Sequence, residues 1–179
     1  MLMYKLLICC TKIYTKIIHT IIFVCAISAI TIGMVTGIQA QQNAIAKSPT
    51  AKHFYSIHAW SGLVTTALFA LQFVFGFISF LVLLCCDKAT AGFRKKMLPT
   101  HVTFGLVVYS LAVISCISGL MQVAKFRLTG KDGSGYYRSL GEPAIVINAV
   151  GCCMIGLAII LPYIIRNCGP KNRGSFSLN

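Results

Sequence analysis

Histidines are the residues of this sequence best suited to chemistry inside a membrane. The chain has four, and three of them, His19, His58 and His101, lie at the ends of long apolar stretches. Ionisable side chains at membrane depth are costly, and they therefore suggest a function. Two neutral imidazoles at one depth on separate helices can bind one heme iron from both sides. The alternative is that each histidine makes an ordinary interhelical hydrogen bond.

The apolar stretches that carry these histidines predict an all-α membrane protein with four transmembrane helices. The chain has 179 residues, of which 57% are hydrophobic and only three are acidic, a composition that excludes an ordinary soluble domain. A helix satisfies its own backbone polar groups, and about 20 residues of it cross a bilayer. The expected spans are residues 17–38, 57–84, 101–123 and 144–165.

Polar segments separate and flank the four spans. We expect breaks at residues 39–52, 87–96 and 125–142, with Pro99 and Pro143 just before the third and fourth helices. A basic N-terminus (residues 1–16) and a C-terminal tail (residues 166–179) complete the organisation. A cleaved signal peptide is an alternative for the start of the chain. However, the first apolar run continues to Ile38, which is too long for the core of a signal peptide.

The basic residues indicate how the chain is oriented in the membrane. The net charge of +13 comes from short clusters between apolar runs, which fits membrane flanks and not a nucleic-acid surface. With the N-terminus inside, ten Lys and Arg flank the inner side and six lie in the outer loops. Because positive residues concentrate inside, we expect both termini in the cytoplasm. His19 and His101 then share a depth on the cytoplasmic side, and His58 lies toward the outside.

The letters around the histidines resemble the signatures of one membrane family. The run YSIHAWSGL at residues 55–63, followed by LQ at 71–72 and GF at 76–77, resembles the "YSLHSWxGL…LQ…GF" signature of the cytochrome b561 family. Further along, LPTH at residues 98–101, with Gly105 and with Gly119-Leu120, is similar to the "LPxH…G…GL" helix of that family.

Two basic motifs near the predicted cytoplasmic side are also similar to this family. Lys12, Lys16 and His19 reproduce its "KxxxKxxH" spacing, and Arg94 stands seven residues before His101. Lysines four residues apart share a helical face, and His19 follows one turn deeper. Without the family spacing, the same basic residues would be ordinary anchors on the inner side of the membrane.

The resemblance covers about residues 5–165 and implies four helices of a b561-type bundle. In that family, six helices carry two b-type hemes in a four-helix core. Electrons pass singly from cytoplasmic ascorbate to an acceptor outside, either monodehydroascorbate or a ferric chelate. The implied activity is that of an ascorbate-dependent transmembrane reductase in the plasma membrane or an endomembrane vesicle, with the lipid bilayer as its environment.

The resemblance also implies roles for individual residues. His19 and His101 would bind the iron of the cytoplasmic heme, and His58 would be one ligand of the outer heme. The residues implied at the ascorbate site are Lys12, Lys16 and Arg94, and Lys12 would also contact the heme. The residues implied at the edge of the outer heme are His53, Phe54, Tyr55, Ser56 and Gln122. Gln122 stands where the family is expected to have glutamate, and His53, from its loop position alone, is an ordinary surface residue.

The sequence also departs from the family. The family has two helices before the one that carries His19, and the second of them supplies the partner of His58. Here about sixteen residues precede the first span, and no fourth intramembrane histidine exists. We therefore expect one heme b with both ligands, and we expect the outer heme to be lost unless His58 acquires a partner. A second copy of the chain, in a homodimer, could supply the other ligand.

Two alternatives to a reductase remain open from the sequence. The first is a truncated, non-catalytic membrane subunit that binds heme or a partner. The second is a scaffold of four membrane helices without heme, in which the cysteine pairs Cys9-Cys10 and Cys85-Cys86 would be palmitoylated.

Overall fold

The structure is a computed structural model, and its described residues form four long helices. It describes residues 12–48, 50, 52–82, 87–128, 137 and 139–167. The helices, in chain order, are α2 (Lys12–Lys47), α3 (Ile57–Phe80), α4 (Asp87–Arg127) and α5 (Glu142–Asn167). Each is long and apolar enough to cross a membrane. The predicted all-α membrane fold is therefore confirmed. The cysteine pairs of the scaffold alternative lie outside the described residues.

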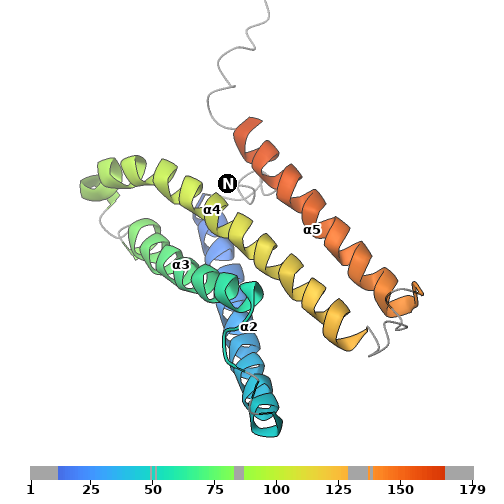
Figure 1. Ribbon diagram of the computed structural model, residues 1–179. Coiled ribbons are helices and arrows are strands. Elements are labelled where there is room, and N and C mark those ends of the chain that lie inside the picture. The colour runs from blue at the N-terminus through green and yellow to red at the C-terminus, as the bar shows by residue number, and fades with distance from the viewer. Residues whose placement is uncertain are drawn as a thin grey trace, which may run out of the picture.

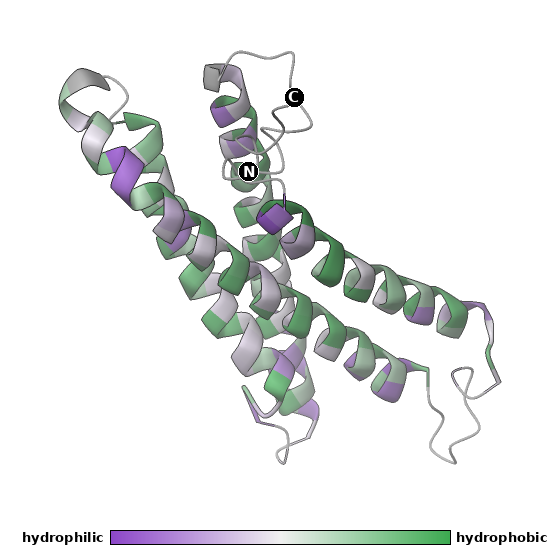
Figure 2. Cartoon of the chain, turned by 90° about the horizontal axis from the view of Figure 1, so that it is seen from above, coloured by the Kyte–Doolittle hydropathy of each residue, from purple (hydrophilic) through white to green (hydrophobic). Residues whose placement is uncertain are grey.

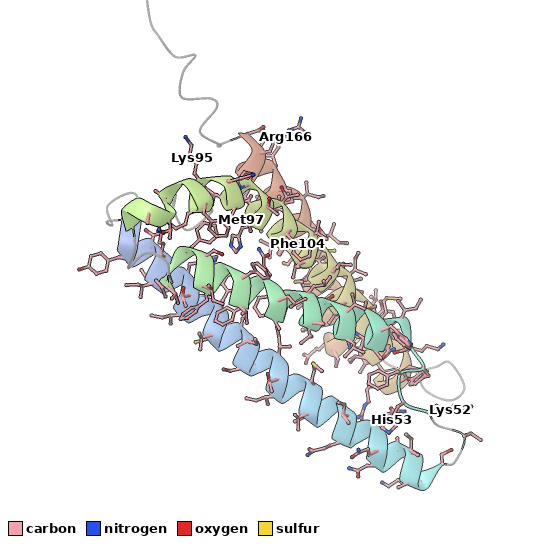
Figure 3. The ribbon with its side chains drawn as sticks, turned by 90° about the vertical axis from the view of Figure 1, so that its left-hand side faces the viewer. Lys52, His53, Lys95, Met97, Phe104 and Arg166 are labelled. Carbon is pink, nitrogen blue, oxygen red and sulfur yellow. The ribbon has the colours of Figure 1, made fainter. Side chains whose placement is uncertain are left out.

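Helix α4 is the central element of the fold. Figure 1 shows α4 with α3 along one side and α5 along the other, while α2 contacts α3. Consecutive helices run in opposite directions, so α2 and α4 begin at the same end, which we call the inner end. Lys95 and Arg166 lie at this end, and Lys52 and His53 lie at the opposite, outer end (Figure 3).

Two of the expected polar breaks are helical. Helix α2 continues from the apolar span through residues 39–47, which are rich in Ala, Gln and Lys and therefore favour helix. Helix α4 begins at Asp87 and runs through Pro99, although the sequence suggested a helix start after this proline. His101 therefore lies well inside α4 and not near its first turn. The last residues of the expected second span, 83–84, lie outside the described part of the chain.

The helices are longer than the membrane is thick, which explains these extensions. At about 1.5 Å per residue, the 41 residues of α4 extend roughly 60 Å, twice the hydrocarbon thickness. The ends of α2 and α4 can therefore lie in water, where polar residues are compatible with helix.

Most of the helix surface is apolar and exposed, as expected for segments that face lipid. Figure 2 shows hydrophobic residues along all four helices, with hydrophilic ones grouped mainly toward their ends. The buried apolar residues within the described part of the chain are few: Phe69, Val108, Val113, Ala124 and Ala144. Three of these belong to α4, so the closest packing follows the central helix.

Candidate functional site

Two histidines lie directly against glycines of the facing helix between α3 and α4. A Cβ atom on Gly76 would lie 2.7 Å from Cε1 of His101, and one on Gly119 would lie 2.9 Å from Cε1 of His58. Any side chain at either position would overlap the imidazole, so only glycine leaves the ring this room. We call the contact of His101 with Gly76 the inner notch and that of His58 with Gly119 the outer notch.

The two notches arise from one spacing that occurs twice. Gly76 follows His58 by 18 residues in α3, and Gly119 follows His101 by 18 residues in α4. Eighteen residues make five helical turns, so the histidine and the glycine of each helix share a face. When two such helices pack in opposite directions, each histidine meets the glycine of the other. This equal spacing is a sequence signal from which the contact can be predicted.

A second pair of reciprocal contacts between α3 and α4 lies between the inner and outer notches. The position of a Cβ on Gly62 would be 3.3 Å from Oγ of Ser115, and that on Gly105 would be 3.4 Å from Nε2 of Gln72. Each of these glycines follows a notch histidine by four residues. Ser115 and Gln72 each precede a notch glycine by four. The interface is therefore repeated in its spacing, although the side chains differ.

The hydrogen bonds to the two imidazoles are opposite in direction. Nδ1 of His58 lies 2.9 Å from the backbone oxygen of Ser115. A carbonyl oxygen only accepts, so Nδ1 of His58 carries the proton and Nε2 keeps a free electron pair. Nδ1 of His101 lies 2.9 Å from Nε2 of Gln72. An amide nitrogen only donates, so Nδ1 of His101 accepts. The same Gln72 nitrogen also donates to the backbone oxygen of His101 at 2.7 Å.

His19 lies at the inner end on α2, beside aromatic side chains. Its ring centroid is 4.4 Å from that of Phe23, which in turn stacks on Phe69 of α3 at 5.4 Å. The ring of Phe80 lies 5.1 Å from that of His101. The structure therefore places both predicted histidines at the inner end, each beside an aromatic ring.

This arrangement fits a heme held by two axial histidines. His19 and His101 are half-buried, come from helices that begin at the same end, and have aromatic neighbours that exclude water. His101 also borders a mainly apolar cavity of about 270 Å³ between α3 and α4. Met97 and Phe104 line this cavity on α4 and are seen near the inner end in Figure 3. Apolar walls beside a candidate iron ligand such as His101 suit a porphyrin ring.

The predicted basic group lies on the two helices that carry this pair. Lys16 is half-buried on α2, one turn before His19, and Arg94 is half-buried on α4, where it donates a hydrogen bond to the hydroxyl of Thr90. The backbone of Lys12 forms the first described residue of α2, and its side chain lies outside the described part. Lys16 and Arg94 are therefore both at the inner end of the molecule.

The residues predicted beside the outer heme lie in or near the connection that leads into α3. His53, Phe54 and Tyr55 are exposed, and Phe54 adopts a left-handed backbone with φ 51°. The Phe54 ring lies 6.3 Å from His53 on one side and 6.3 Å from Trp60 on the other.

Ser56 has a structural role that the sequence analysis did not assign. It is the N-cap of α3, and its hydroxyl accepts a hydrogen bond from the backbone N–H of Ala59 at 3.2 Å. Gln122 is half-buried on α4, three residues after Gly119, so it lies about one turn beyond the outer notch.

Comparison with known proteins gives one consistent family. Residues 1–127 match the family described as eukaryotic cytochrome b561. The chain is 36% identical over 116 residues to a lysosomal membrane ascorbate-dependent ferrireductase of Danio rerio, covering 64% of this chain and 45% of the relative. It is 29% identical over 163 residues to a probable ascorbate-specific transmembrane electron transporter of Oryza sativa subsp. japonica, covering 89% of this chain and 63% of the relative. The chain thus spans about half the length of the curated relatives it matches.

Proposed function

Because this chain belongs to the eukaryotic cytochrome b561 family, we propose that it is a b-type cytochrome that accepts electrons from cytoplasmic ascorbate. The observation that carries the proposal is that His19 of α2 and His101 of α4 are both half-buried beside aromatic rings, on helices that begin at the same end. The relatives named as ascorbate-dependent reductases and electron transporters support the choice of donor. The proposed acceptor is a ferric chelate or monodehydroascorbate on the other side of the membrane.

The proposed overall reaction moves one electron at a time. The ascorbate monoanion loses one electron and one proton and becomes monodehydroascorbate, while a ferric ion outside gains one electron and becomes ferrous. A bound heme b supplies the one-electron chemistry between ferric and ferrous iron. The residues of the chain bind and orient the reactants and keep water from the center.

In this proposal, His19 and His101 would hold the iron of the inner heme. Gly76 leaves space for the His101 ring on the facing helix. Phe23 lies beside the imidazole of His19, and Phe80 lies beside that of His101. Lys16 and Arg94, with Lys12, attract the ascorbate monoanion and the heme propionates by charge. This assignment orients residues 17–165 as the membrane domain with both termini in the cytoplasm.

His58 is the proposed ligand at the outer end. Its Nδ1–H is bound to the carbonyl of Ser115, which leaves Nε2 ready to bind a metal. His53, Phe54, Tyr55, Ser56 and Gln122 would border the edge of a heme held there. The second axial ligand would come from outside these four helices, either from a second copy of the chain or from another subunit. Transfer to the outer side would require that ligand.

The proposal is tested by the heme content and absorption spectrum of the purified full chain. We expect a low-spin b-type spectrum that ascorbate reduces, and we expect His101→Ala to lose it because one axial ligand cannot keep the iron six-coordinate. Gln41→Leu is a suitable control, since Gln41 lies on α2 near the outer end and donates only to the Lys52 carbonyl. A His101→Ala protein with full heme content and an unchanged low-spin spectrum would refute the assignment.

A further inference from the structure

Gln72 makes two hydrogen bonds to the same residue of the facing helix. Its amide nitrogen lies 2.9 Å from Nδ1 of His101 and donates to the backbone oxygen of His101 at 2.7 Å. Gln72 is half-buried at the inner notch, four residues before Gly76. The carboxamide therefore restrains both the ring and the backbone of a proposed iron ligand.

This hydrogen bond places the ring proton of His101 on the nitrogen that would have to bind iron. With an amide N–H directed at Nδ1, the neutral ring carries its proton on Nε2. Iron binding at Nε2 needs a free electron pair there, so the proton must lie on Nδ1, which then needs an acceptor. The observed orientation of Gln72 offers a donor instead. The arrangement therefore suits the heme-free ring, and the heme-bound ring requires the carboxamide oxygen.

We propose that Gln72 is the positioning residue of His101 and that its carboxamide turns when heme binds, so that Oε1 accepts a hydrogen bond from Nδ1–H. This inference rests on the proposed ligand role of His101. In the turned state, Gln72 gives up its bond to the His101 carbonyl, because two oxygens would otherwise face each other.

The surroundings of Gln72 leave room for this turn. The side chain borders the cavity of about 270 Å³ that His101 also lines. Gly105, the residue on α4 beside the amide, has no side chain to block it. Rotation about the last side-chain bond exchanges the oxygen and nitrogen of the carboxamide, and a shift of the side chain toward the cavity would separate Oε1 from the His101 backbone oxygen, so neither helix needs to move.

The consequence is that Gln72 should influence the midpoint potential of the inner heme and the affinity of the chain for it. An acceptor on the distal nitrogen of an axial histidine raises the basicity of the ligand and stabilises ferric iron, which lowers the midpoint potential. Replacing Gln72 with leucine removes the acceptor, so the potential should rise and the heme affinity should fall about 10–100-fold. Gln72→Glu offers only oxygen atoms, so it should retain heme and lower the potential below that of the wild type.

The test is redox titration and low-temperature electron paramagnetic resonance of the heme-loaded full chain. Gln41→Leu is the matched control, since it removes an amide that also donates to a backbone carbonyl but lies at the outer end, away from the inner notch. We expect opposite potential shifts in Gln72→Leu and Gln72→Glu, altered ferric g values in both, and no change in the control. If Gln72→Leu binds too little heme to titrate, retention of heme by Gln72→Glu supports the proposal.

Two results would overturn the proposed role of Gln72. One is that both Gln72 variants keep the potential and g values of the control. The other is that both lose heme equally, since glutamate keeps the acceptor. The His101→Ala variant separates this inference from the proposed function: if it loses the heme while the Gln72 variants match the control, only the role of Gln72 fails. If it keeps the heme, the ligand assignment itself fails.

Discussion

The inner and outer notches of α3 and α4 are alike in packing and opposite in hydrogen bonding. In both, an imidazole lies against a glycine that sits 18 residues from the histidine of its own helix. At the outer notch, a backbone carbonyl accepts from His58. At the inner notch, a side-chain amide donates to His101.

Two separate features of each notch determine how its histidine can act: the position of the ring and the nitrogen that is free to bind a metal. Glycine spacing determines where the ring lies, because no other residue leaves enough room on the facing helix. The partner of Nδ1 determines which nitrogen is free to bind a metal. The outer ring is already arranged as a ligand, whereas the inner ring depends on a side chain that can turn.

Replacing the notch glycines with a larger residue should have the largest effect on heme binding, and this effect should differ between the inner and outer notches. Gly76→Val would place atoms in the space of the His101 ring, so the ring must leave and the inner low-spin heme should be lost. Gly119→Val is the matched change at the outer notch, where it should displace His58 and leave the inner heme spectrum intact. The reduced-minus-oxidised spectrum of the two variants measures this. Equal loss in both would mean that valine disrupts the α3–α4 interface as a whole.

Neutralising the basic residues of the inner end should have an intermediate effect on rate. Lys16→Gln or Arg94→Gln should slow reduction by ascorbate about tenfold, because positive charge raises the encounter rate of an anion. Reduction by a neutral hydroquinone should change little, and both rates follow from stopped-flow absorbance. Lys95→Gln, an exposed position one residue from Arg94, is a control for general surface charge. If both reductants slow equally, these residues affect the heme or the fold and not the encounter.

Removing His58 should have a smaller effect on the chain alone. Under the proposed assignment the outer heme lacks its second ligand, so we expect about one heme per chain and an inner heme unchanged by His58→Ala. We also expect a stability loss of about 1 kcal/mol for the lost hydrogen bond. Ferric reduction outside ascorbate-loaded vesicles should be slow in both proteins. The inner and outer notches lie about 27 Å apart along each helix at 1.5 Å per residue. Robust wild-type flux that His58→Ala abolishes would instead show that a second heme is bound.

The sequence predicted the membrane fold well, because long apolar runs require helices wherever lipid is the solvent. The pairing of His19 with His101, expected from their similar depth, stays a prediction. The sequence misplaced the start of the helix that carries His101. Apolar length indicates where the membrane is, and a helix can continue through polar residues such as 87–96 outside it.

The hydrogen-bond partners of the imidazoles could not be predicted in the same way. The Ser115 carbonyl has no signal of its own in the sequence, since every residue has a backbone oxygen. Gln72 was seen only as one letter of a family signature. Its role depends on the relative rotation of two helices, which the spacing of His58 and Gly76 could have indicated.

The smallest effect is expected for Ser115→Ala, which tests whether the hydrogen bond of His58 depends on the Ser115 side chain or only on its backbone oxygen. Ser115 is buried, and it corresponds at the outer notch to Gln72 at the inner one. Its hydroxyl does not make the bond to His58, because the backbone oxygen does. Ser115→Ala should therefore leave the His58 hydrogen bond intact and change the free energy of unfolding by about 0.5 kcal/mol or less. Denaturant unfolding and the imidazole nitrogen resonances of His58 measure these quantities. A shift of the His58 proton from Nδ1 to Nε2 in this variant would show that the hydroxyl supports the bond, and the two notches would then both depend on side chains.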